Sequence, residues 1–487
     1  MVKLFATKKK EKILDFSSSW YYLCDQKGVP CDGEIFFEDE YIVINSLENK
    51  FFLNLLYEIE GFGKVMVRTE LLSLKKNTYH LNDVLINGRI KEISGLISRL
   101  KKESIPVSNT WLKDFYNAQK KRNYSQLMNL GEILSLKSAR YLLRLKIING
   151  RMKSFKFGGQ AFGLIEHGDA YKKRFVSFYD YATAPFYFFL TRPQRNKTDW
   201  KFTDKIVDWL SSENIPIKGH PLVWFHQAAL PEWMKLLSYE ELKHFIQQHV
   251  RETVLRYKNR IHIWDITNEF PTIDANALNL SINQLLELLS IISKEVKRIQ
   301  PEAYRIINIS DIFGSKSYIH DIPSVPPVYF LRLAKKRGIE FEAVGLQFYT
   351  GMRKEFACRE FLDIGRQLDE YVSLGKDLHL TECEIPSRHD VDPECFFSAD
   401  HPEVAGKWHK PWSEKIQSEY LKNLLITFSS KPKAKAFTWW TFTDKGVHQD
   451  IGSRFIPFGG LLRRDLSPKP SYIMLNNFKN EIRQTKE

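Results

Sequence analysis

The stretch Ile261-His262-Ile263-Trp264-Asp265-Ile266-Thr267-Asn268-Glu269 is an isoleucine-rich run that ends in polar residues. Short runs of this composition are typical of strands buried in a parallel sheet. The segment that follows, residues 282–299, has apolar residues at helical spacing. The two segments together predict one strand followed by one helix that packs back on the sheet.

The same alternation continues on both sides of this stretch, over residues 154–487. Further helices are predicted over 202–210, 240–257, 328–337 and 472–482. The predicted strands cover residues 157–165, 178–182, 215–223, 261–266, 303–309, 341–346, 378–381 and 434–439. Eight strands that alternate with helices indicate an α/β fold of the closed (β/α)8 type, a TIM barrel.

Two other regions precede the predicted barrel. Residues 1–78 contain short apolar runs at 34–37, 41–45, 51–59 and 64–69, which predict a small β-rich accessory domain. Residues 79–153 show helical periodicity and predict a helical connector with two helices, the second over 127–148. The β-rich part fits either a carbohydrate-binding module or a structural cap. The lack of a flexible linker favours the cap.

Composition narrows the class of protein. A hydrophobic content of 43% is sufficient for a full core and excludes global disorder. The net charge of +14 comes from short, scattered clusters such as Lys8-Lys9-Lys10, which fit solvated faces better than a nucleic-acid surface. The chain has five cysteines and no Cys-x-x-Cys pair, so we expect no disulfide framework, no metal site and no cofactor.

The sequence also bears on location. No apolar stretch of signal-peptide type follows the basic amino-terminus, and no run of about 18 apolar residues exists. We therefore expect no membrane partner and a cytoplasmic location, with unconventional export left open. Nothing in the sequence indicates an oligomeric state.

Two glutamates follow strands of the predicted barrel. Glu269 comes directly after the fourth strand, and Glu382 after the seventh. Barrel enzymes carry their catalytic groups at the carboxyl ends of strands. A pair of carboxyl groups across such a cleft is what glycoside hydrolysis requires, with one protonated and the other ionised. Each glutamate alone is weak evidence for catalysis, because most carboxylates at strand ends are capping or surface residues.

The sequences around these glutamates resemble glycoside hydrolase family 10, which consists mostly of endo-β-1,4-xylanases. Asn268-Glu269 and Thr381-Glu382 are similar to the catalytic strands of that family. Four further motifs occur in the family's order: Gly219-His220-Pro221-Leu222-Val223-Trp224, Val344-Gly345-Leu346-Gln347, Trp439-Trp440-Thr441-Phe442-Thr443-Asp444, and the closing segment 460–472. The amino-terminal extension resembles that of a divergent bacterial branch.

The resemblance implies a retaining endo-β-glycanase that cleaves β-1,4 bonds of xylan or a related polysaccharide through a covalent glycosyl-enzyme intermediate. Glu269 is then the general acid/base and Glu382 the nucleophile, and Asn268 binds the sugar 2-hydroxyl. The other residues implied in substrate binding are His220, Trp224, Gln347, Tyr349 and Trp440. The partner is a polysaccharide or oligosaccharide. The alternatives are a non-catalytic glycan-binding barrel and a transglycosylase.

The sequence departs from the family at three places. After the second strand, the stretch 183–189 (Thr-Ala-Pro-Phe-Tyr-Phe-Phe) replaces the polar motif that binds the next sugar. Tyr349 stands where the family has a histidine near the nucleophile. Phe225 replaces the histidine after the third-strand tryptophan, with His226 displaced by one position. The nearby Arg192 and Arg195 are candidates to compensate for the lost polar groups and to favour an acidic substituent.

Overall fold

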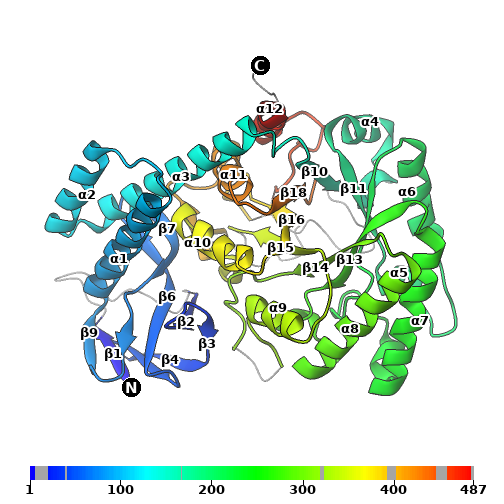
Figure 1. The fold of residues 1–487 in the computed structure, drawn as a ribbon, viewed down its shortest axis with the longest axis horizontal. Helices are drawn as coiled ribbons and strands as arrows, with labels where there is room; N and C mark the ends of the chain where they lie inside the picture. Colours follow the sequence, from blue (N-terminus) through cyan, green and yellow to red (C-terminus); the bar gives the residue numbers. More distant parts are fainter. Residues whose placement is uncertain are drawn as a thin grey trace.

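The computed structural model describes residues 1–5, 20–38, 41–165, 167–318, 323–351, 353–391, 402–445 and 458–483. Eight parallel strands form a closed barrel, as predicted, and helices surround it (Figure 1). β18 pairs with β10 and closes the ring. The strands are β10 (Lys156–Gln160), β11 (Tyr181–Pro185), β12 (Ile217–His220), β13 (Ile261–Asn268), β14 (Tyr304–Ile309), β15 (Ala343–Tyr349), β16 (Asp377–Glu384) and β18 (Ala434–Trp439).

The barrel helices follow the apolar periodicity of the sequence. Capping boxes, Ser238 with Glu241 and Ser281 with Gln284, begin the two helices on either side of β13. The helices are α4 (Gly168–Phe178), α5 (Phe188–Thr191), α6 (Lys201–Ser212), α7 (Tyr239–Tyr257), α8 (Ile282–Ile299), α9 (Pro327–Lys336), α10 (Phe361–Val372), α11 (Glu414–Ser429) and α12 (Pro470–Arg483).

A fully buried tryptophan packs between the third and fourth strands and the helices that cover them, and its ring N–H donates to Gln300 at the end of α8 at 3.1 Å. Trp264 packs edge-on against Phe186 at 5.2 Å between ring centroids. A Cβ atom on Gly219 would lie only 2.3 Å from the Trp264 ring. Gly219 is therefore required for this packing.

The structure corrects several predicted boundaries. The second strand is Tyr181–Pro185 and not 178–182, because Tyr171, Phe175 and Phe178 belong to the helix α4 and bury the same face of it. The first and third strands are shorter than predicted. The seventh is longer and includes Glu382. The prediction also missed the helix α2 (Asn109–Lys121).

The amino-terminal region forms two antiparallel-rich sheets followed by three helices, α1 (Leu81–Lys102), α2 and α3 (Tyr124–Ile148). One sheet has the order β4-β5-β1-β9 and the other β17-β7-β6-β2-β3, with β8 paired to β6. The strands are β1 (Val2–Phe5), β2 (Tyr21–Asp25), β3 (Pro30–Cys31), β4 (Gly33–Glu38), β5 (Tyr41–Ser46), β6 (Lys50–Ile59), β7 (Gly63–Arg68), β8 (Leu72–Ser73), β9 (Thr78–His80) and β17 (Lys407–Trp408).

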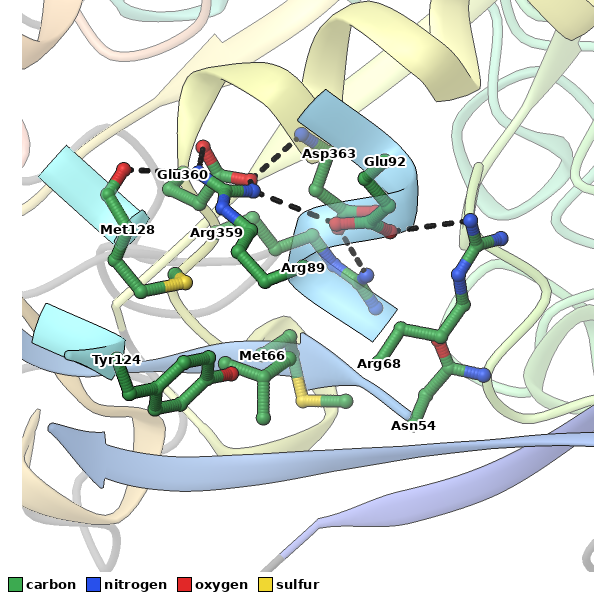
Figure 2. A pocket seen from close by; sticks show the side chains of 11 residues that line it. Asn54, Met66, Arg68, Arg89, Glu92, Tyr124, Met128, Arg359, Glu360 and Asp363 are labelled. Carbon is green, nitrogen blue, oxygen red and sulfur yellow. Dashed lines mark hydrogen bonds and ion pairs between the residues drawn. The ribbon is translucent and has the colours of Figure 1, made fainter. Parts of the chain in front are cut away.

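Strand pairing and ion pairs join the amino-terminal region to the barrel. β17, which lies between β16 and α11 in the sequence, pairs with β7 of the second sheet. Figure 2 shows a buried ion-pair network between α1 and the start of α10. In it, Arg89 contacts Glu92 at 3.4 Å and Glu360 at 2.9 Å. Separating the regions would break the pair between Arg89 and Glu360 and leave the buried Glu360 without this partner, which is costly.

Membrane-spanning helices and metal-binding clusters are absent from the described part of the chain. No helix there is long and apolar enough to cross a membrane. The same residues contain no cluster of three or more His, Cys, Asp or Glu side chains arranged to hold a metal ion. Cys24, Cys31, Cys358 and Cys383 are free thiols, while Cys395 and Lys8-Lys9-Lys10 lie outside the described residues.

Candidate active site

Glu269 and Glu382 lie at the carboxyl ends of β13 and β16. Glu269 is the first residue after β13 and has a left-handed backbone with a φ of 58°. Its N–H donates to the Asn308 carbonyl of the next strand at 2.8 Å. A non-glycine residue in this region is strained, and such strain persists where the surrounding structure fixes a functional side chain.

Three polar side chains surround the carboxylate of Glu382, which is 4% exposed. Tyr349 Oη donates to Oε2 at 2.6 Å, and Asn308 Nδ2 donates to Oε1 at 2.8 Å. His220 Nε2 lies 3.6 Å from Oε1. These contacts come from β12, β14 and β15, so three other strands fix the position of this carboxylate.

The carboxylate of Glu269 accepts a hydrogen bond from Trp224 Nε1 at 3.0 Å. The negative charges of Glu269 and Glu382 both act on the phenols of Tyr187 and Tyr349 and raise their pKa, in addition to the larger effect of burial. The two carboxyl groups therefore lie near the same two phenol rings.

Asp265 fixes the orientation of His220. Asp265 Oδ2 lies 2.7 Å from His220 Nδ1 and 2.7 Å from Lys218 Nζ, and all three side chains are buried. Burial lowers the pKa of His220, so the ring is neutral. Its Nδ1–H donates to Asp265, because Lys218 and His220 hold the pKa of that carboxyl low against the effect of burial. Nε2 is then an acceptor beside Glu382, suited to a sugar hydroxyl.

A second network orients Asn268. Its Oδ1 accepts from Asn308 Nδ2 at 2.7 Å and from Gln347 Nε2 at 3.1 Å. With Oδ1 occupied, Asn268 presents its Nδ2 group as a donor. Gly345 makes room for this network, since a Cβ atom there would lie 2.6 Å from Asn308 Oδ1. The glycine of the sixth-strand motif is thus needed for the position of Asn308.

The two carboxyl groups share their titration. Burial, together with the charge of Glu269, raises the pKa of Glu382 to about 8, and burial also raises the pKa of Glu269. Two interacting carboxyls release their protons in two joint steps, so the pair keeps one proton at neutral pH. Glu382 accepts the shorter bonds, 2.6 and 2.8 Å against 3.0 Å for Glu269, which favours the charge on Glu382 and the proton on Glu269.

Aromatic side chains form the remaining wall. Tyr187 lies 5.4 Å from Trp224 and 6.0 Å from His220 between ring centroids. Trp440 is half-buried and meets His220 edge-on at 5.4 Å. Together with Phe162 and Phe189 these rings form a small apolar cluster separate from the barrel core. The position after the second strand therefore offers ring faces where the family's pattern has polar groups.

The structure also places the other departures from the pattern. Phe225 is fully buried and stacks on Phe270 at 5.3 Å, so it belongs to the core. His226 stacks on Trp224 at 4.8 Å, and its charge lowers the pKa of Glu269 against the effect of burial. Arg192 does not compensate for the lost polar groups, because it is buried and bonds to His249, Thr198 and Glu252. Arg195 is exposed and pairs with Glu241 at 2.9 Å.

All eight residues predicted for the site lie at this end of the barrel, and the structure adds others that the sequence reading missed. Asn308 and Asp265 contact the predicted residues directly, and Lys218 contacts Asp265, as described above. Lys316, paired with Asp274, acts on Glu269 from the loop after β14. Asp265 and Lys218 lie within quoted motifs or next to them. Asn308, by contrast, lies on a strand that contains no recognised motif.

A closed parallel barrel with a half-buried glutamate after its fourth strand and a buried glutamate at the end of its seventh is the arrangement of a barrel glycoside hydrolase. Comparison with known families gives the particular one. The model for glycosyl hydrolase family 10 matches residues 188–477, more than half of the chain, and the chain belongs to this family. It is an endo-1,4-β-xylanase-like glycoside hydrolase.

The similar proteins are distant in sequence. Endo-1,4-beta-xylanase B of Thermotoga neapolitana is 23% identical over 304 residues, which cover 59% of this chain and 77% of that one. Endo-1,4-beta-xylanase B of Neocallimastix patriciarum is 22% identical over 276 residues, 55% of this chain but only 27% of that one. The solved family 10 structure from Paenibacillus barcinonensis has a TM-score of 0.53 and 18% identity, and covers 69% of this chain and 97% of that one. This structural likeness supports the fold.

Proposed function

We propose that this protein is a retaining endo-β-1,4-glycanase that hydrolyses xylan or a related polysaccharide, with Glu382 as nucleophile and Glu269 as general acid/base. One observation carries the proposal. Glu382 is held by three side chains from separate strands, and Glu269, held by Trp224, lies close enough for its charge to raise the pKa of Glu382. The relatives in Thermotoga neapolitana and Neocallimastix patriciarum are endo-1,4-beta-xylanases, which agrees with this substrate class.

The reaction takes two steps in this geometry. The Glu382 carboxylate attacks the anomeric carbon while the Glu269 carboxylic acid gives its proton to the leaving oxygen, and a glycosyl ester forms on Glu382. Glu269, now ionised, then takes a proton from water, which attacks the anomeric carbon and releases Glu382. Asn268 Nδ2 donates to the sugar 2-hydroxyl, and His220 Nε2 accepts from a second hydroxyl of the same sugar.

A transglycosylase would use the same intermediate, with a sugar in place of water. Product analysis decides between the two. Hydrolysis gives xylo-oligosaccharides whose reducing ends increase with every bond cut. Transfer gives products longer than the starting oligosaccharide with no such increase. A non-catalytic glycan-binding barrel would give neither product, and its binding would survive the loss of either glutamate.

We expect low activity on unsubstituted xylan. Phe186, Tyr187 and Phe188 are buried aromatic residues that stand where the family has polar groups, and Arg192 is held elsewhere. Each missing hydrogen bond to a sugar hydroxyl costs on the order of 1 kcal/mol, and several together lower kcat/KM by about a hundredfold. The measurement compares plain xylan, glucuronate-bearing xylan and mixed-linkage glucan. Plain xylan as the best substrate, at an efficiency typical of the family, would contradict this account.

The pH profile tests the coupled pair. We expect a bell-shaped kcat/KM. Activity falls on the acid side when both carboxyls are protonated, because Glu382 is then neutral, and it falls above about pH 8 when the last proton leaves. Tyr349→Phe removes a donor that lowers the pKa of Glu382, so the acid limb should move to higher pH. Tyr187→Phe, the matched control, should leave that limb in place. An unmoved acid limb in Tyr349→Phe would refute this role of the phenol.

For the amino-terminal region we propose the role of a structural cap. The pairing of β17 with β7 and the hydrogen bond from Met66 N to the Cys358 carbonyl at 2.8 Å support it. A cap predicts that Arg89→Met lowers the thermal stability of the barrel. A carbohydrate-binding module predicts weaker polysaccharide binding with unchanged stability.

A further inference from the structure

A cavity of about 240 Å³ lies between α1, α3, α10 and α11, where the helical connector meets the barrel. Figure 1 shows these four helices side by side, and their contacts agree. The volume exceeds the space for one water many times and admits a ligand the size of a monosaccharide. None of its lining residues belongs to the active site.

The charged lining of this cavity is mostly basic. Five cationic side chains and one carboxylate, Glu92, face it from β7, α1, α10 and the turn after α11. Acids behind the lining pair with some of the cations, as Glu70 does with Lys91 at 2.5 Å. The five cations are Arg68, Lys91, Arg99, Arg366 and Lys431.

The carboxylates around the cavity are too few for these cations, and three of them serve two cations each. Asp369 pairs with both Arg99 and Lys431, each at 2.5 Å. The other two shared carboxylates appear in Figure 2. Glu92 pairs with Arg68 at 3.1 Å and with Arg89 at 3.4 Å, and Asp363 pairs with Arg359 at 2.8 Å and with Arg366.

Two buried donors in this network lack acceptors. Arg68 Nε and Arg366 Nε make no hydrogen bond within the described part of the chain. The two guanidinium groups also lie close together, since Nη1 of each is within 3.7 Å of one point, the Cβ position of Gly28. Burial and the charge of Arg366 lower the pKa of Arg68. Like charges placed together without enough acceptors favour an anion.

The hydroxyl groups of the lining residues are available as hydrogen-bond acceptors, unlike the cations, which are donors. Ser135 donates to the Phe361 carbonyl, and Ser138 to that of Ser135, at 3.1 and 2.8 Å. Thr427 and Ser430 likewise donate to backbone carbonyls, each at 2.8 Å. Because their hydrogens are used, these four oxygens act toward a ligand as acceptors. They fit a molecule that has hydroxyl groups of its own.

We propose that this cavity binds an acidic sugar, with its anionic group against Arg68, Arg99 and Arg366 and its hydroxyl groups donating to the serine and threonine oxygens. The anion is a carboxylate in a uronic acid or a phosphate in a sugar phosphate, and the chemistry of the lining suits both. The proposal concerns a site separate from Glu269 and Glu382, so it stands independently of the function proposed above.

Isothermal titration of the full chain with glucuronate, glucose 6-phosphate, glucose and inorganic phosphate tests the proposal. We expect submillimolar binding of at least one of the two acidic sugars and at least tenfold weaker binding of glucose and inorganic phosphate. Arg99→Gln should weaken the binding at least tenfold, because it removes a cation from the mouth of the cavity. Lys101→Gln, on the same helix but away from the lining, is the matched control and should change nothing.

Gly95→Leu provides a test that leaves every charge in place. A Cβ atom at Gly95 meets nothing within 4 Å, so the leucine side chain enters open space at the lining, and a helix tolerates it well. This variant should fold and lose the sugar. Equal binding of inorganic phosphate and the acidic sugars would overturn the proposal, as would equal effects of Arg99→Gln and Lys101→Gln. The absence of binding by both acidic sugars at 10 mM would also overturn it.

Discussion

Glu382→Ala should lower turnover of aryl β-xylobiosides by about 10⁴-fold or more while the barrel stays folded, because the substitution removes the attacking group itself. Azide should restore activity, since it fits the space of the lost carboxylate and attacks the same face of the sugar. The product is then the α-glycosyl azide. Initial rates with and without azide and the anomeric configuration of the product are the measurements.

The fold is expected to survive because the substitution removes a buried carboxyl group, whose charged form is costly to bury. Thermal melting checks this, with Glu302→Ala, an exposed glutamate, as the matched control. Near-normal turnover in Glu382→Ala, or a β-glycosyl azide from this variant, would show that Glu382 is not the nucleophile.

Glu269→Ala should affect substrates according to their leaving groups. A basic leaving oxygen, as in a xylo-oligosaccharide, needs protonation, so we expect a loss of about 10²–10⁴-fold. An activated dinitrophenyl leaving group needs no proton, so its release should stay nearly as fast as in the parent enzyme. The measurement is the first-turnover burst of dinitrophenolate beside steady-state hydrolysis of xylo-oligosaccharides.

Azide should also act on Glu269→Ala, but with the opposite result. Azide replaces water in the second step. Because azide is already an anion, this step needs no general base, and the product is the β-glycosyl azide. Equal losses on both leaving groups would indicate that Glu269 positions the sugar and does not donate the proton. The contrast between α and β products separates the roles of the two glutamates within one experiment.

The barrel was predictable from the sequence because its strands are continuous apolar runs and its helices have a clear period. The prediction was wrong where aromatic residues are compatible with both a strand and a helix. Phe178 fits a strand by composition, yet it ends α4, because its spacing from Tyr171 and Phe175 buries all three on one face. Propensity in such a short segment yields to tertiary packing.

The glutamates could be found because they end strands within recognisable motifs. Their surroundings could not, because the partners come from strands distant in sequence. Asn308 contacts Glu382 and Asn268 across separations of 74 and 40 residues, and nothing local marks it. The hydrogen bonds from Arg192 to His249 and Glu252 could not be predicted either, because they depend on how α7 packs beside the end of β11.

The central claim, a covalent intermediate on Glu382, is tested most directly by trapping. The enzyme is incubated with dinitrophenyl 2-deoxy-2-fluoro-β-xylobioside, which forms the glycosyl ester quickly and hydrolyses slowly, and the digest is analysed by mass spectrometry. We expect the peptide containing Glu382 to gain the mass of the fluorinated disaccharide. A label on Glu269, or dinitrophenolate release without a label on any peptide, would contradict it.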